Sequence, residues 1–163
     1  MAYQPERRKE EVSSYLSAKL RQPVMVTSLT RLSSGHSRET LIVATDLPGY
    51  PDFVFRIEQG GVLGTSGEPE FRLLNALHGG PVPVPRALWL EEDTKWFGYP
   101  FMVSERVEGD GGAGYLTDPV QKGEVLREYV KTIAQMHTHS PAGLGLGYME
   151  IPKDTRQATL RQI

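Results

Sequence analysis

Cysteine is absent from this 163-residue chain, and its absence excludes several kinds of chemistry. Without thiols the sequence can supply no disulfide framework, no cysteine-ligated zinc site and no thiol nucleophile. An excess of one charge is also lacking, because 18 lysines and arginines nearly balance 20 aspartates and glutamates, for a net charge of −2. This balance gives no electrostatic reason to expect nucleic acid or an anionic membrane as a partner.

Long hydrophobic runs are missing as well. No stretch reaches the ~18 consecutive apolar residues that a membrane-spanning helix needs. No apolar run follows the charged residues near the N-terminus, so we expect no secretory signal and, by elimination, a cytoplasmic protein. Glycine and proline are plentiful, with 17 and 12 residues. They fall mainly between the candidate elements, as is typical of a sheet with several loops.

The spacing of apolar residues predicts a mixture of helices and strands. Helices are expected over 5–21, 69–78 and 119–138, and from 154 to 163. Strands are expected over 24–32, 40–45, 53–57, 86–90 and 101–107. Because helices do not alternate with strands throughout, a doubly wound parallel sheet is disfavoured. We therefore predict an α+β fold, in which one helix packs on a five-stranded antiparallel sheet and the first helices of a helical domain follow.

A glycine-rich segment separates these two parts. We expect a first lobe over 1–107, a linker over 108–116 and the start of a helical lobe over 117–163. No glycine, proline or polar cap ends the last predicted helix, which indicates that the sequence stops within an element. The helical part also carries an apolar stripe that needs a surface to pack on, so we expect self-association or cover by another chain. The stripe consists of Val125, Tyr129, Ile133, Met136, Leu160 and Ile163.

Two short segments carry the strongest functional signal. The first is a turn of small and polar residues that leads into a strand, and it contains Ser33, Ser34, Gly35, His36 and Ser37. The second is the strand 53–57, which has one cation, Arg56, embedded in it. A small-residue loop exposes backbone N–H groups that can wrap phosphate oxygens, and a cation on a neighbouring strand can reach the same phosphates. The pattern predicts the front half of a kinase-like nucleotide site.

Four segments in this order resemble the N-terminal lobe of the aminoglycoside phosphotransferase family, a branch of the protein-kinase-like fold. They are the loop 32–40, the strand 53–56, the helix 70–77 with the extended run 82–86, and the segment 101–109. The resemblance looks closest to the subgroup related to the kinase-like domains fused to acyl-CoA dehydrogenases. No single segment is decisive, and the specificity comes from their order.

The resemblance implies a role for each matching residue. Arg56 would contact the α- and β-phosphates where most kinases have a lysine, and Glu70 would pair with Arg56. The backbone of residues 33–37 would cover the phosphates, while the Glu105 carbonyl and the Val107 N–H would meet the edge of adenine. The implied cofactors are ATP and Mg²⁺, and the implied partners are a nucleotide and a small-molecule phosphate acceptor.

The catalytic loop of that family has no counterpart here. The family's catalytic Asp lies in a His-Gly-Asp-type loop, with an Asn five residues after it, and a second Asp binds metal. Neither Asp118 nor Asp154 has such neighbours, so we expect no catalytic residue and no metal ligand. The chain then looks like the ATP-binding lobe of a small-molecule phosphotransferase that transfers the γ-phosphoryl group to a hydroxyl in the intact protein, and is itself inactive. The alternative is a stand-alone kinase-like binding or scaffolding module without catalysis.

Each of these residues also has a purely structural interpretation. Residues 33–37 fit an ordinary hairpin loop, and Arg56 fits a surface cation on a strand. Glu70 fits an acidic first-turn residue that complements the helix dipole. Residues 105–107 fit a plain strand. Only their combination in one chain favours the nucleotide site.

Overall fold

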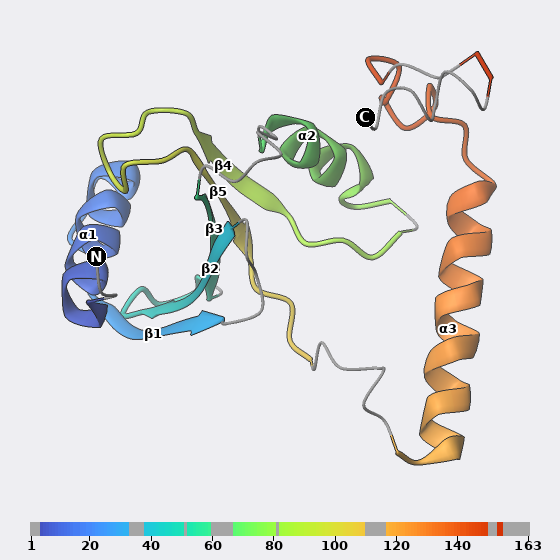
Figure 1. Ribbon diagram of the computed structural model, residues 1–163, viewed down its shortest axis with the longest axis horizontal. Helices are drawn as coiled ribbons and strands as arrows, with labels where there is room; N and C mark the ends of the chain where they lie inside the picture. The colour runs from blue at the N-terminus through green and yellow to red at the C-terminus, as the bar shows by residue number, and fades with distance from the viewer. Residues whose placement is uncertain are drawn as a thin grey trace. The chain divides into compact units, whose positions relative to one another are not determined.

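The computed structural model describes residues 4–32, 38–50, 52–59, 67–80, 82–109, 117–149 and 153–154. In chain order the elements are α1 (Pro5–Leu20), β1 (Val26–Leu32), β2 (Arg38–Thr45), β3 (Phe53–Glu58), α2 (Glu68–Leu77), β4 (Ala87–Glu91), β5 (Phe101–Glu105) and α3 (Pro119–His137) (Figure 1). The chain divides into two compact units. All strands, α1 and α2 belong to the first unit, and α3 belongs to the second.

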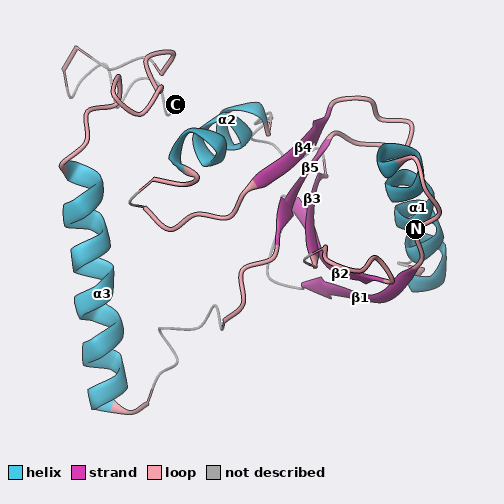
Figure 2. Cartoon of the chain, turned by 180° about the vertical axis from the view of Figure 1, so that it is seen from behind, coloured by secondary structure: helices cyan, strands magenta, loops and turns pink. Residues whose placement is uncertain are grey.

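The strands of the first unit form one sheet in the order β1-β2-β3-β5-β4 (Figure 2). Every neighbouring pair is antiparallel. β5 therefore lies inside the sheet beside β3, while β4 forms an edge, and α2 packs near β4. The predicted α+β fold with a five-stranded antiparallel sheet is confirmed.

The strand predicted over 101–107 is shorter than expected, since β5 ends at Glu105. The Arg106 N–H still donates to the Asp52 carbonyl at 2.8 Å, but Asp52 precedes the first residue of β3. Arg106 and Asp52 both lie beyond the ends of their strands, β5 and β3, so the chain leaves the sheet at this point. The helix predicted over 154–163 lies outside the described residues except for Asp154.

Helix α1 covers the side of the sheet that holds the hydrophobic core. It begins at Pro5, whose missing N–H is not needed in the first turn, and it ends at Leu20, after which Arg21 adopts a left-handed cap with φ 54°. Its Tyr15 side chain is 1% exposed. The Tyr15 ring meets the rings of Phe101 and Phe55 edge-on, with centroid distances of 4.8 and 5.8 Å. This aromatic cluster fixes α1 against the sheet.

Strands β2 and β3 have two different faces because successive side chains point to opposite sides. Leu41 and Val43 of β2, and Phe53 and Phe55 of β3, are all fully buried in the core. The residues between them are only partly buried. The second face of these two strands is therefore free to carry charged side chains.

Helix α3 of the second unit begins after Asp118, whose Oδ1 accepts a hydrogen bond from the Val120 N–H at 2.9 Å. None of its residues is buried. Tyr129 is 62% exposed, and Val125 and Met136 are exposed by 39% and 38%. That another surface covers this stripe stays a prediction. No helix in the described ranges combines the length and the apolar character needed to cross a membrane.

The hydroxyl of Tyr15 generates a testable prediction, because it is buried and has no hydrogen-bond partner among the described residues. Burial, together with the charge of Glu91, raises the pKa of Tyr15, so the hydroxyl stays neutral. Tyr15→Phe removes an unsatisfied polar group and should leave the free energy of unfolding unchanged or raise it by about 1 kcal/mol. Tyr15→Leu should lower it by about 2–4 kcal/mol, because ring contacts are lost and a cavity remains. Urea unfolding measures both, and a loss above about 1 kcal/mol in Tyr15→Phe would show that the hydroxyl has a partner.

Candidate functional site

Arg56 and Glu70 come together on the face of the sheet opposite the core. Arg56 lies on β3, Glu70 lies in the first turn of α2, and Arg56 Nη1 donates to Glu70 Oε1. Their side chains are 34% and 29% exposed, so the pair is accessible to solvent and to a ligand. The predicted approach of these two residues is observed. Their role in binding a nucleotide stays a prediction.

A second arginine shares Glu70. Arg38, the first residue of β2, donates from Nη1 to Glu70 Oε2 at 2.7 Å, and its Nε lies 3.0 Å from Glu58 Oε1. Strand register explains this contact, because Arg38 is paired with Glu58 between β2 and β3. Glu70 therefore uses one carboxylate oxygen for each arginine, and it links β2, β3 and α2.

Arg38, Arg56, Glu58 and Glu70 form the Glu70 cluster, in which the charges of two arginines balance those of two glutamates. Partial burial lowers the pKa of Arg38, but the hydrogen bond to Glu70 and the charges of Glu58 and Glu70 raise it, and the net result is a raised pKa. Arg38 therefore stays charged at every physiological pH. An Arg held on two sides cannot rotate freely, so Arg38 is suited to hold Glu70 in place for Arg56.

Arg38 and Glu58 were not assigned roles from the sequence. Glu58 could have been found by alternation, because it lies two residues after Arg56 and so shares its face of the strand. Arg38 was part of the loop motif, but its contacts depend on the register of β2 against β3. That register is set by the connection between the strands and by the buried face, and neither shows in a local motif.

The predicted adenine-binding segment lies at the end of β5. The Glu105 N–H donates to the Arg86 carbonyl at 3.0 Å, so this residue is held to the chain that leads into β4. Arg106 is fixed by its side chain as well, since Nη1 lies 2.8 Å from Asp52 Oδ2. Val107 follows with 67% of its surface exposed. Among the described residues, no backbone carbonyl accepts a hydrogen bond from the Val107 N–H.

The phosphate-covering segment, Ser33 to Ser37, lies outside the described residues. Within the described ranges, no group of three or more histidine, aspartate or glutamate side chains could hold a metal ion. The Mg²⁺ that the family resemblance implies for the intact protein stays a prediction. Asp118, one of the two acids considered above, caps α3.

Comparison with known proteins places these observations in a family. The sequence matches the phosphotransferase enzyme family over residues 28–163. A search of curated proteins gave no match. Among solved structures, the chain is similar to the crystal structure of a candidate aminoglycoside phosphotransferase from Ralstonia eutropha JMP134, with a TM-score of 0.65 and 25% sequence identity.

That structural similarity covers 94% of this chain and 45% of the Ralstonia chain. The chain thus spans less than half the length of this structural relative. The family match takes in well over half of the present sequence, including the whole of β2, β3, α2, β4, β5 and α3. This chain belongs to the phosphotransferase enzyme family.

Proposed function

We propose that this chain forms the ATP-binding lobe of a small-molecule phosphotransferase, which in the whole protein transfers a γ-phosphoryl group to a substrate hydroxyl. The observation that carries the proposal is the Arg56–Glu70 ion pair on the face of the sheet opposite the core. An arginine oriented by a carboxylate keeps further N–H donors for phosphate oxygens. The finer assignment, to the subgroup resembling domains fused to acyl-CoA dehydrogenases, is also proposed and rests on the four sequence segments alone.

The positions along β3 and β5 support a nucleotide as the ligand. Phe53 is paired with Glu105, and Arg56 lies three residues further along β3. At ~3.3 Å per residue, about 10 Å along the strand separates Arg56 from the adenine-binding segment. An extended nucleoside phosphate bridges such a separation. The Glu105 carbonyl and the exposed Val107 N–H would then meet adenine, while Arg56 would meet the α- and β-phosphates.

The contribution of this chain to the reaction would be binding and orientation. Phosphoryl transfer depends on positioning and on neutralising the charge of the phosphates. Arg56 would supply positive charge, and Arg38 would act as a positioning residue that keeps Glu70 directed toward Arg56. We propose no catalytic residue and no metal-dependent step within this chain, which we expect to lack turnover alone. A binding module without catalysis would share the nucleotide affinity, and the full-length reading frame distinguishes the two.

Nucleotide binding gives the first test of this function. Titration calorimetry should detect weak ATP binding to the chain, and Arg56→Ala should weaken it about 10- to 100-fold, because hydrogen bonds to charged groups contribute about 1.5–3 kcal/mol. Adenosine, which has no phosphate, should bind both proteins equally. Arg72→Ala on the exposed side of α2 is the matched control and should leave the affinities for ATP and adenosine unchanged. Equal ATP affinity in Arg56→Ala and the unaltered chain would contradict the role of Arg56.

Arg38 gives a separate test of positioning. Arg38→Gln should weaken ATP binding less than Arg56→Ala does, and it should lower the free energy of unfolding by about 1–2 kcal/mol, because Glu58 and Glu70 lose a charged partner. The loss of ATP affinity caused by Arg56→Ala should be smaller in the Arg38→Gln background than in the unaltered chain. The reason is that Glu70 no longer holds Arg56 firmly once Arg38 is replaced. Purely additive losses in the double variant would show that Arg38 stabilises the fold without positioning Arg56.

A further inference from the structure

A cavity of about 670 Å³ lies among elements of the first unit and is separate from the cluster around Glu70. Its wall includes the start of α1, Arg31 of β1, Glu39 of β2 and the connection between β4 and β5. Glu39 is the residue after Arg38, so its side chain points to the opposite face of the sheet. The volume falls within the range of pockets that hold small molecules.

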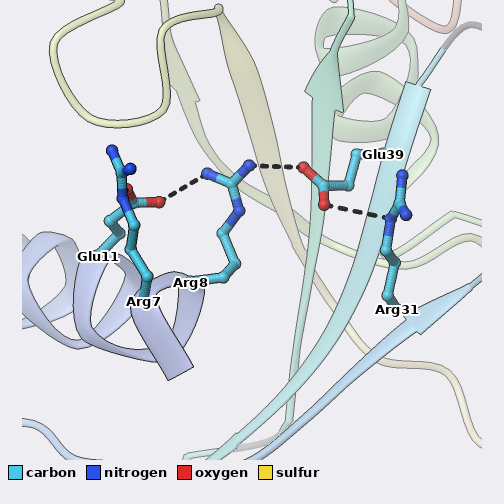
Figure 3. Close-up of polar contacts among 5 residues, drawn as sticks. All are labelled: Arg7, Arg8, Glu11, Arg31 and Glu39. Carbon is cyan, nitrogen blue, oxygen red and sulfur yellow. Dashed lines mark hydrogen bonds and ion pairs between the residues drawn. The ribbon is translucent and has the colours of Figure 1, made fainter. Parts of the chain in front are cut away.

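The polar wall of this cavity is a chain of alternating charges (Figure 3). Glu39, whose side chain is only 2% exposed, lies between two arginines: Arg8 Nη2 is 2.9 Å from Oε2, and Arg31 Nε is 3.3 Å from Oε1. Arg8 also reaches Glu11 Oε2 at 2.7 Å, and Arg7 Nε reaches Glu11 Oε1 at 2.9 Å. Three guanidinium groups thus share two carboxylates.

Positive charge is in excess where the chain of charges meets solvent. Arg7 and Arg31 are both cationic, and their side chains are 63% and 42% exposed. Each guanidinium has five N–H donors, so an arginine that already binds a glutamate can also donate to a ligand. Lys95 also lies in the wall, and its charge is balanced by Asp93, whose Oδ2 is 2.8 Å from Lys95 Nζ. The buried carboxylate is satisfied, and the surplus charge faces the open side.

Aromatic side chains complete the wall and hold two of the cations. The guanidinium of Arg8 lies 5.3 Å from the centre of the Phe97 ring, and Lys95 Nζ lies 5.4 Å from the centre of the Trp96 ring. Contacts of this kind fix the direction of a cation. Since Arg8 also pairs with Glu11 and Glu39, several contacts hold it, so this part of the cavity is organised before any ligand arrives.

We propose that this cavity binds a small molecule with two or more oxyanion groups, carboxylate or phosphate, which accept hydrogen bonds from Arg7 and Arg31. Guanidinium groups match the planar, two-oxygen edge of both kinds of oxyanion. The two exposed arginines come from different elements and contact different carboxylates, so a ligand with several anionic groups gains more than a single anion does. The site lies on the core side of the sheet and does not rest on the proposed nucleotide function.

Binding of pyrophosphate and of citrate to the full 163-residue chain tests the proposal and separates the two sources of oxyanion. Titration calorimetry should show saturable binding of at least one of them. Binding is also followed in ¹H–¹⁵N spectra through the Trp96 indole signal, which is assigned with the variant Trp96→Phe. The double substitution of Arg7→Gln and Arg31→Gln should weaken that binding at least tenfold. It leaves Arg8, one of the two arginines that contact the buried Glu39 carboxylate, in place, and unfolding by urea verifies that the fold survives.

A further variant serves as the control. Lys19→Gln, on α1 but outside the cavity wall, should leave the affinity unchanged. The absence of saturable binding by both probes would overturn the proposal. Binding that survives in the double variant would overturn it as well.

Discussion

The packing of α1 on one face of the sheet is the constraint on which the rest of this structure depends. Tyr15 lies among the rings of Phe55 and Phe101, and this contact commits one face of β2 and β3 to the core. Since side chains alternate along a strand, the opposite face receives the residues in between. Arg56 reaches Glu70 of α2 because the aromatic residue next to it in the chain is buried on the other side.

Much of this arrangement could be predicted from the sequence, because it follows from local periodicity. The apolar alternation of residues 53–57 predicts the strand, and it also predicts that Arg56 lies on the face opposite the apolar side chains. The amphipathic pattern of 69–78 gave α2, with Glu70 in its first turn. Contacts that depend on how distant elements meet could not be predicted. Arg8 and Glu39 are 31 positions apart, and nothing local to either residue shows that α1 brings them together.

The two charged clusters lie on opposite faces of β2 and join it to different elements. On one face Arg38 joins β2 to β3 and α2, and on the other face Glu39 joins β2 to α1 and β1. Both residues directly follow the segment that the family resemblance assigns to phosphate binding. Family membership gives the fold a functional context, and the proposals concern which ligand each face receives. The two faces are chemically different, because the Glu70 cluster is balanced in charge and the cavity wall is rich in cations.

The consecutive opposite charges of Arg38 and Glu39 also bear on how the sheet assembles. A slip of β2 by one residue would turn each side chain to the other face. A slip in one direction would put Glu39 in the place of Arg38, against Glu58 and Glu70, and a slip in the other direction would put Arg38 in the place of Glu39, against Arg8 and Arg31, so either slip would place like charges together. The slip would also expose Leu41 and Val43, which are fully buried in the observed pairing. Electrostatic repulsion and lost burial thus act against the same error, and this dipeptide favours the observed strand alignment over either shifted one.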